Sequence, residues 1–149
     1  MRYLRNLHIL LVENNPGDVR LIQEALKESN RDYHIHLDIV PDGEEALRCL
    51  LRQGTYADRE TYPDLILLDL NLPKKDGREV LMEIKRNARL RVIPVIVLTT
   101  SEAEQDIQRT YELHANCYIT KPVDINQFFE VFKAIELFWF NVVKLPKLK

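Results

Sequence analysis

The stretch HILLVENNPGD, residues 8–18, contains an apolar run that stops abruptly at polar side chains. Ile9 to Val12 are apolar without alternation, as expected of a strand that is covered on both faces. Glu13 and two asparagines follow at once, and Pro16 can then open a helix with Asn15 as its cap. A buried strand that ends in an acid and two amides places polar groups at the edge of a sheet. The stretch therefore predicts either a simple turn or half of a cation site.

Similar apolar runs recur along the chain. DLILLDL (64–70) and PVIVLTT (94–100) are apolar almost throughout, and CYIT (117–120) is a shorter run. HIHLDIV (34–40) instead alternates apolar and polar residues, which is typical of an edge strand with one wet face. Amphipathic stretches of helical period fill the gaps. Five alternations of strand and helix predict an α/β fold, a doubly wound parallel sheet of flavodoxin-like order 2-1-3-4-5 with helices on both faces.

The composition is that of an ordinary globular domain. The 149 residues predict one domain, with a core at about 6–137 and an aromatic tail at 138–149. A formal net charge of −2 argues against nonspecific nucleic-acid binding. No run of 18 apolar residues predicts a membrane span, and the first residues do not form a secretory signal. Cys49 and Cys117 are far apart and are interpreted as reduced thiols, so we expect a cytoplasmic protein.

Polar side chains stand where four of the five predicted strands end. They are Glu13 and Asn14 after the first run, Asp69 after the third, Thr99 in the fourth and Lys121 after the fifth. The carboxyl ends of parallel strands line the crevice where ligands bind in open sheets. Each residue alone would more simply be a cap, a turn residue or a solvated side chain. Their common placement at one edge favours a functional site.

This set of side chains suits phosphoryl transfer. Carboxylate and amide oxygens bind a hard cation such as Mg²⁺, which keeps few protein ligands and prefers phosphate and water besides. The cation would screen the Asp69 carboxylate from an incoming phosphoryl group and stabilise charge on the transferring oxygens. Lys121 supplies a second positive charge, and the Thr99 hydroxyl can donate to a phosphoryl oxygen. Asp69 is therefore a candidate nucleophile that forms an aspartyl phosphate.

The chain resembles the receiver domain of two-component response regulators from about His8 to the end of the last helix. ILLVEN, DLILLDLNLPKKDG, IPVIVLTTS and YITKP carry the resemblance, in the family's order and spacing. DLNLPKKDGREVL, the long loop before the third strand and the tail IELFWFNVVKLP are most similar to the small single-domain regulators of phytochrome-type histidine kinases. The resemblance implies a signalling phosphoacceptor that takes a phosphoryl group from a partner kinase with Mg²⁺. Such a protein catalyses only its own phosphoryl transfer and is not otherwise an enzyme.

The resemblance also implies roles for the residues of the site. Asp69 matches the aspartate that is phosphorylated, and Glu13 and Asn14 stand where the family has its acidic pair. Asn71 would lend its backbone carbonyl to the metal. Lys121 matches the lysine that pairs with the phosphoryl group.

Two positions match the family's switch, and a third matches its cis peptide bond. Thr99 corresponds to the hydroxyl that shifts on phosphorylation, and Tyr118 corresponds to the aromatic side chain that moves inward with it. An aromatic residue at a strand end can also be plain core filler. Pro122 follows Lys121, at a peptide bond that is usually cis in the family, and X-Pro bonds permit this at modest cost.

Asn14 departs from the family pattern, which usually has Asp there. An amide oxygen can ligate Mg²⁺ but brings no negative charge, so we expect a metal site that is weaker than the family norm. The alternative interpretation is a phosphorylation-independent binding module with a degenerate metal site. Asp69, Thr99 and Lys121 are all present, which favours retained phosphorylation.

Two enzyme classes fit the residues poorly. An aspartate phosphatase would need a second acid two residues after Asp69, and that position is Asn71. Dinucleotide or flavin binding would need a glycine-rich phosphate turn, and none of the four glycines lies in a GxGxxG motif.

The end of the chain predicts how the signal leaves. NVVKLPKLK after the last helix is too short for a DNA-binding domain, so we expect output through contacts with a downstream protein that the sequence does not identify. Phe138, Trp139 and Phe140 are consecutive and cannot share one helix face. At least one should be exposed or covered by another chain, which predicts a homodimer through the last helix and tail. The alternative is a tail that folds onto its own domain.

Overall fold

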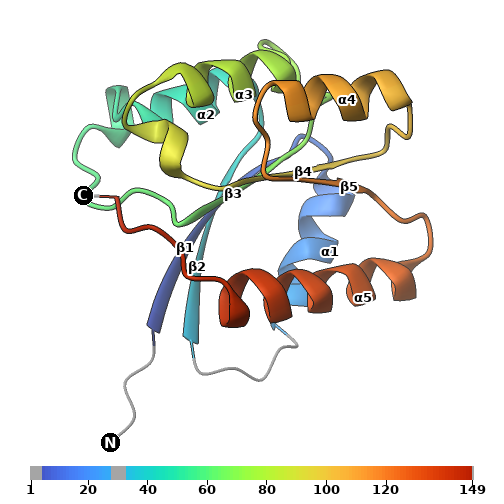
Figure 1. Ribbon diagram of the computed structural model, residues 1–149. Helices are drawn as coiled ribbons and strands as arrows, with labels where there is room; N and C mark the ends of the chain where they lie inside the picture. Colours follow the sequence, from blue (N-terminus) through green and yellow to red (C-terminus); the bar gives the residue numbers. More distant parts are fainter. Residues whose placement is uncertain (1–4, 28–32, 149) are drawn as a thin grey trace, which may run out of the picture.

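The computed structural model describes residues 5–27 and 33–148. Its sheet has five parallel strands in the order β2-β1-β3-β4-β5, as predicted (Figure 1). The strands are β1 (Arg5–Val12), β2 (Tyr33–Val40), β3 (Leu65–Leu68), β4 (Val95–Thr99) and β5 (Cys117–Thr120).

Helices cover both faces of this sheet. Helices α1 (Pro16–Lys27) and α5 (Ile125–Ile135) pack on one face, and α2 (Gly43–Leu50), α3 (Gly77–Arg86) and α4 (Glu104–Glu112) lie on the other (Figure 1). Short 3-10 turns at Gly54–Tyr56 and Leu90–Val92 interrupt the connections before β3 and β4. None of the helices in the described ranges has both the length and the apolar character that crossing a bilayer requires.

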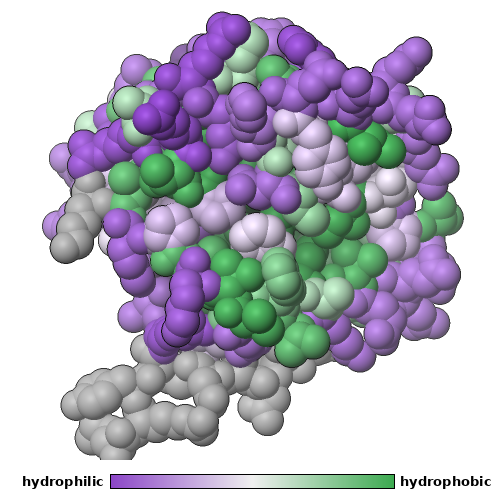
Figure 2. Space-filling model, viewed as in Figure 1, coloured by the Kyte–Doolittle hydropathy of each residue, from purple (hydrophilic) through white to green (hydrophobic). Residues whose placement is uncertain are grey.

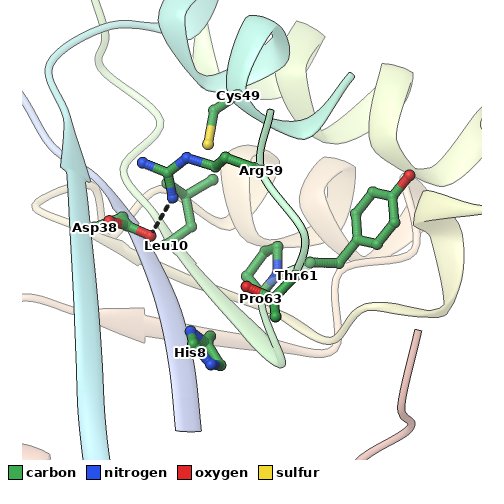
Figure 3. Close-up of a pocket in the computed structure, with 8 residues that line it drawn as sticks. His8, Leu10, Asp38, Cys49, Arg59, Thr61 and Pro63 are labelled. Atoms are coloured by element: carbon green, nitrogen blue, oxygen red, sulfur yellow. Dashed lines mark hydrogen bonds and ion pairs between the residues drawn. The ribbon is translucent and has the colours of Figure 1, made fainter. Parts of the chain in front are cut away.

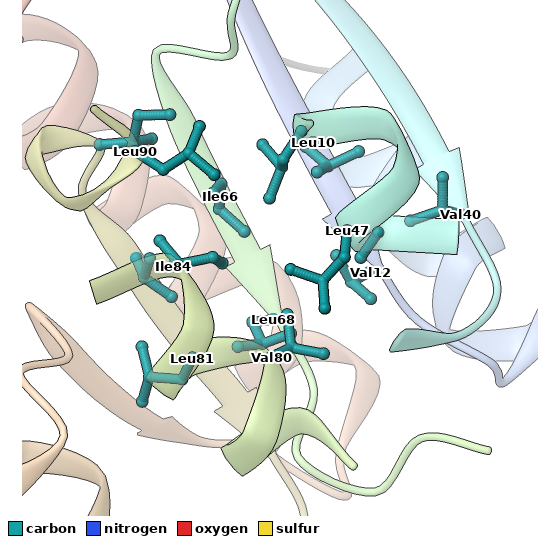
Figure 4. Packing of buried hydrophobic residues seen from close by; sticks show 14 of the residues in the cluster. Leu10, Val12, Val40, Leu47, Ile66, Leu68, Val80, Leu81, Ile84 and Leu90 are labelled. Atoms are coloured by element: carbon teal, nitrogen blue, oxygen red, sulfur yellow. The ribbon is translucent and has the colours of Figure 1, made fainter. Parts of the chain in front are cut away.

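The central strands are buried on both faces, which explains their unbroken apolar sequences. Alternate residues of β1 and β3 point to opposite layers: Leu10 and Leu68 join the cluster under α2 and α3, while Leu11 joins the cluster under α1 and α5. Figure 4 shows the first cluster, where side chains from β1, β2 and β3 meet those of α2 and α3. Strand β2 forms an edge, as predicted. His34 and His36 are exposed on the predicted wet face, but Ile39 on the other face is exposed as well.

The core extends beyond the expected limit at residue 137. The helix does not stop after Ile135 but continues as a π-helix, Glu136–Val142, in which the Val143 amide donates to the carbonyl of Phe138, five residues earlier. This wider turn brings Phe140, 1% exposed, onto the same buried side as Ile135. The ring of Phe140 then packs edge-on against Tyr33 at a centroid distance of 5.6 Å. A sequence pattern interpreted with the α-helical period of 3.6 residues could not reveal this change to a π-helix.

Candidate functional site

The predicted residues meet at the carboxyl edge of the sheet because the parallel hydrogen-bond ladder continues past each strand. The amide of Glu13 donates to Val40 (3.1 Å), and that of Asp69 donates to Val12 (3.1 Å). The Lys121 amide likewise donates to the carbonyl of Thr99 (2.7 Å). These bonds hold the ends of all five strands in register, and the side chains of Glu13, Asp69 and Lys121 meet there.

The Lys121 ammonium lies among carboxylates from three different elements. Its Nζ is 2.8 and 3.0 Å from the two Glu13 carboxylate oxygens. The same atom is 3.1 Å from Asp69 Oδ2 and 2.8 Å from Asp18 Oδ2. Sequence reasoning brought Glu13, Asp69 and Lys121 together correctly but missed Asp18. A signal was present: Asp18 lies in the first turn of α1, directly after the strand whose end forms the site.

Burial dominates the electrostatics of this cluster. Glu13 is 3%, Asp69 8% and Lys121 7% exposed. Burial raises the pKa of Glu13 to about 7, against the opposing hydrogen bond from Lys121. Burial by itself would lower the pKa of Lys121, but its hydrogen bonds to Asp18 and Glu13 outweigh this and raise that pKa. Lys121 therefore carries its positive charge throughout the physiological range.

Thr99, the last residue of β4, carries a buried hydroxyl without a hydrogen-bond partner within residues 5–27 and 33–148. Its side chain is fully buried, and its Oγ1 has no hydrogen-bond partner among the described residues. A buried hydroxyl without a partner is costly, and such a group is available to donate to an oxygen that arrives. Tyr118 does not engage it, because the Tyr118 hydroxyl donates to the carbonyl of Ser101 at 2.9 Å.

A polar network that the sequence did not reveal holds the segment around Tyr118. Asp106 at the start of α4 accepts from the Ser101 hydroxyl (2.6 Å) and from the Arg78 guanidinium of α3 (2.6 Å). These two hydrogen bonds, that from Ser101 first, lower the pKa of Asp106. The network links α3 to the β4–α4 connection. In that connection, the carbonyl of Ser101 accepts the hydrogen bond from the Tyr118 hydroxyl.

The peptide bond before Pro122 is trans, because no cis bond occurs in residues 5–27 and 33–148. The expected cis bond is therefore wrong for this structure. A trans X-Pro bond is the intrinsically favoured form, by about 0.5–1 kcal/mol. Lys121 reaches all three carboxylates from this trans backbone.

The residues present fit a cation of the Mg²⁺ type. Glu13 and Asp69 supply two carboxylates, while the exposed Asn14 and Asn71 can supply neutral oxygens, from the side chain and the backbone respectively. In the described part of the chain, no three His, Cys, Asp or Glu side chains converge in metal-binding geometry. A set of two carboxylates completed by water and phosphate oxygens is nevertheless what Mg²⁺ commonly uses. The Asn71 amide also donates to Asp69 Oδ1 at 3.2 Å, which places Asn71 beside the acceptor carboxylate.

The three aromatic residues predicted as an interface differ in exposure. Phe138 is 52% exposed, Trp139 is half-buried and Phe140 is buried. Phe140 is therefore wrong as an interface residue, because the π-helix turns its ring into the core. Leu137 and Val142 are exposed beside Phe138, and Figure 2 shows apolar surface gathered where the end of α5 lies in Figure 1.

A pocket beside β1 and β2, away from the Lys121 cluster, is a structural feature and not a ligand site. Figure 3 shows it beside β1 and β2 and under the segment that follows α2, where Arg59 pairs with Asp38 at 2.5 Å. His8 and Cys49 also line this pocket. Its volume of about 10 Å³ is hardly enough for one water molecule.

Comparison with known proteins supports the interpretation of the site. Residues 9–133 match the family of the response regulator receiver domain. Response regulator Rcp1 of Synechocystis sp. is 53% identical over 138 residues, 93% of this chain and 92% of that protein. The probable methanogenesis regulatory protein FilR2 of Methanothrix harundinacea is 39% identical over 139 residues, 93% of this chain and 86% of that protein.

Two solved structures match in fold as well as in sequence. The Mn²⁺-bound form of Rcp1 has a TM-score of 0.88 at 51% identity, covering 94% of this chain and 99% of that one. The phosphorylated cyanobacterial phytochrome response regulator RcpA has a TM-score of 0.88 at 52% identity, covering 95% and 99%. A five-stranded doubly wound sheet with Lys121 and Glu13 gathered at Asp69, together with these matches, shows that the chain belongs to the response regulator receiver domain family.

Proposed function

We propose that this chain accepts a phosphoryl group on Asp69 from a partner histidine kinase and thereby switches a protein-interaction surface. The observation that carries the proposal is the Lys121 ammonium, 3.1 Å from Asp69 Oδ2 in a buried cluster. A buried cation beside an acceptor carboxylate lowers the repulsion that an anionic phosphoryl group would otherwise meet. The phosphorylated state of the similar protein RcpA supports phosphoryl acceptance.

In the proposed transfer, an Asp69 carboxylate oxygen attacks phosphorus while the bond from phosphorus to the kinase's histidine nitrogen breaks. The electron pair of that bond stays on the imidazole, which leaves as the neutral ring after taking up a proton. Lys121 pairs with the phosphoryl oxygens, because its ammonium is already held at Asp69. Glu13, Asn14, Asp69 and the Asn71 carbonyl would hold Mg²⁺, which supplies further neutralisation of the phosphoryl charge. The chain catalyses no reaction other than its own modification.

Thr99 and Tyr118 carry the switch in this proposal. The unpartnered Thr99 hydroxyl donates to a phosphoryl oxygen, and the Tyr118 ring moves inward as Thr99 shifts. Tyr118 must then give up its hydrogen bond to the Ser101 carbonyl. This movement changes the surface of α4 and β5, where we place the output to a downstream protein.

The pathway and setting are part of the proposal. RcpA is named as a phytochrome response regulator, and other structures similar to this chain are bacteriophytochrome response regulators, which supports a phytochrome-type kinase as partner. Both cysteines are free, in keeping with the reducing cytoplasm. The net charge of −2 supports output to a protein and not to nucleic acid.

A mass measurement tests the phosphoryl acceptance. We expect the protein, incubated with Mg²⁺ and acetyl phosphate, to gain the mass of one phosphoryl group. Asp69→Asn should abolish the gain, whereas Asp58→Asn, at an exposed loop position, should leave it unchanged. The absence of an adduct on the unsubstituted protein at high Mg²⁺ would instead favour the phosphorylation-independent module. Asn14, an exposed amide in place of the family's usual acid, is the observation that keeps this second candidate in view.

The dimer is a separate part of the proposal. Leu137, Phe138 and Val142 are 66%, 52% and 63% exposed in the C-terminal π-helix, a large apolar area to leave in water. We expect sedimentation to show a dimer at tens of micromolar and Phe138→Ser to weaken it. Val123→Ser is the matched control, because Val123 is fully exposed at the far end of α5. A monomer with and without phosphorylation would contradict this part alone.

A further inference from the structure

Asp18 is a carboxylate in the site to which the proposed phosphoryl transfer assigns no task. Its Oδ2 lies 2.8 Å from Lys121 Nζ, as close as the nearest Glu13 oxygen. The backbone around it is fixed, because the Asp18 amide donates to the Asn15 side chain at 3.1 Å, the cap expected at the start of α1. The side chain of Asp18 is 23% exposed and that of Lys121 is 5% exposed, so the contact reaches from the rim into the interior.

The position of Asp18 relates it to Asn14. Asn14 lies two residues before α1 and Asp18 is the third residue of this helix, so both lie at its N-terminal end. Asn14 leaves the site without one negative charge that the family's pattern usually supplies. Asp18 returns a third carboxylate to the cluster, beside Glu13 and Asp69.

The contacts of Lys121 show what this third carboxylate changes. An ammonium has three donor hydrogens, and here they serve Glu13, Asp69 and Asp18. Glu13 and Asp69 are also the two carboxylates available to a cation. Without Asp18, the ammonium would rely wholly on these two and compete with the cation for their oxygens. With Asp18, Lys121 keeps one anchor that a cation does not need.

We propose that Asp18 is a positioning residue of this site: it holds the Lys121 ammonium beside Asp69 and supplies the negative charge that Asn14 lacks. This inference extends the proposed phosphorylation of Asp69 and depends on it for its functional meaning. Its first consequence is a stronger cation site. Its second is a Lys121 side chain that stays in place when a cation and a phosphoryl group engage Glu13 and Asp69.

The test uses the full chain stripped of metal with EDTA. Free Mn²⁺ is measured by electron paramagnetic resonance during titration, and the phosphorylation rate is measured by intact mass against acetyl phosphate concentration. Asp18→Asn should weaken Mn²⁺ binding about tenfold and lower the maximal phosphorylation rate at saturating Mn²⁺. Asp18→Ser provides a second neutral variant. Glu24→Gln is the matched control, because Glu24 is an exposed acid on the same helix.

Rescue separates charge from anchoring. Adding Asn14→Asp to Asp18→Asn should restore Mn²⁺ affinity, since a third carboxylate returns, but leave the maximal rate low, since Lys121 stays unanchored. Asp18→Glu should keep much of both quantities. The inference would be overturned if both neutral variants had the same Mn²⁺ affinity and the same maximal phosphorylation rate as Glu24→Gln. An unsubstituted protein that takes up no phosphate would overturn the proposed function, while the Mn²⁺ comparison would still decide the role of Asp18.

Discussion

At Thr99, signalling and stability make opposite demands on one hydroxyl. The group is fully buried, and its oxygen has no hydrogen-bond partner in the part of the chain that the structure describes. We expect Thr99→Val to raise the free energy of unfolding by about 1 kcal/mol, because it removes a buried polar group that lacks a partner. The same change should abolish the phosphorylation-dependent movement of Tyr118. Urea denaturation and tyrosine fluorescence measure the two effects, and a destabilised variant would contradict the first.

Glu13 makes stability depend on pH in an unusual direction. Its pKa rises from 4.5 to about 7 on folding, so the folded state binds more protons than the unfolded state between these values. The contribution of Glu13 to stability should therefore fall as the pH rises from 4.5 through 7. In EDTA, we expect Glu13→Gln to be more stable than the unsubstituted protein at pH 8, by about 1–3 kcal/mol, with the difference vanishing toward pH 4.5. Parallel stability curves for the two proteins would refute this.

Individual residues differ in how far the sequence could reveal them. Asp69 and Lys121 were predictable because each directly follows an apolar run, and parallel strands bring their carboxyl ends together. Asp18 and Asp106 were not, because both are acids near helix starts, where a carboxylate usually serves only the helix. The isomer at Pro122 was not predictable either, since the intrinsic preference for trans is only about 0.5–1 kcal/mol and tertiary contacts can decide against it.

At the scale of elements, Gly77 shows how closely α3 approaches the backbone of Asp69 and Leu70, which form the start of the acceptor loop. A Cβ at residue 77 would lie 2.2 Å from the Asp69 carbonyl oxygen and 2.6 Å from Leu70 Cα. Both are backbone atoms that cannot give way without moving the loop. We expect Gly77→Ala to lower the free energy of unfolding by at least about 2 kcal/mol and to slow phosphorylation. Urea titration measures the free energy of unfolding, and intact mass measures the rate of phosphorylation.

Gly17 offers the control for this change. A Cβ there would meet only the Asn15 side-chain oxygen at 3.2 Å, so the neighbour can adjust. Gly17→Ala should leave stability unchanged or slightly raised, because alanine favours the helix. Equal losses in the two variants would mean that the acceptor loop is freer to move than its contacts indicate.

Elements with a clear period were the predictable ones. Unbroken apolar runs marked the central strands, and period two marked β2 as an edge. The extent of the last helix was not predictable, because its pattern of aromatic residues is compatible with both an α-helical and a π-helical continuation. The packing of Phe140 against Tyr33, a contact between distant segments, accompanies the second path.

At the scale of the molecule, the C-terminal turn divides into a buried and an exposed half. Phe140→Ala should cost about 3–5 kcal/mol of unfolding free energy, because its 1% exposed ring leaves a cavity between α5 and β2. Phe138→Ala should cost less than about 1 kcal/mol in the monomer, since that ring is 52% exposed. Denaturation at low protein concentration measures both. A larger loss at Phe138 than at Phe140 would contradict this division.

The segment after the π-helix contacts both layers of the molecule. Leu145 packs against the cluster under α1 and α5, and Leu148 packs against the cluster under α2 and α3. This matters for recombinant expression. A fragment that stops at Ile135, where the α-helix ends, would expose apolar residues of both clusters to water. Such a trimmed fragment should gather in inclusion bodies, and an affinity tag is better joined beyond Leu148 than in place of it.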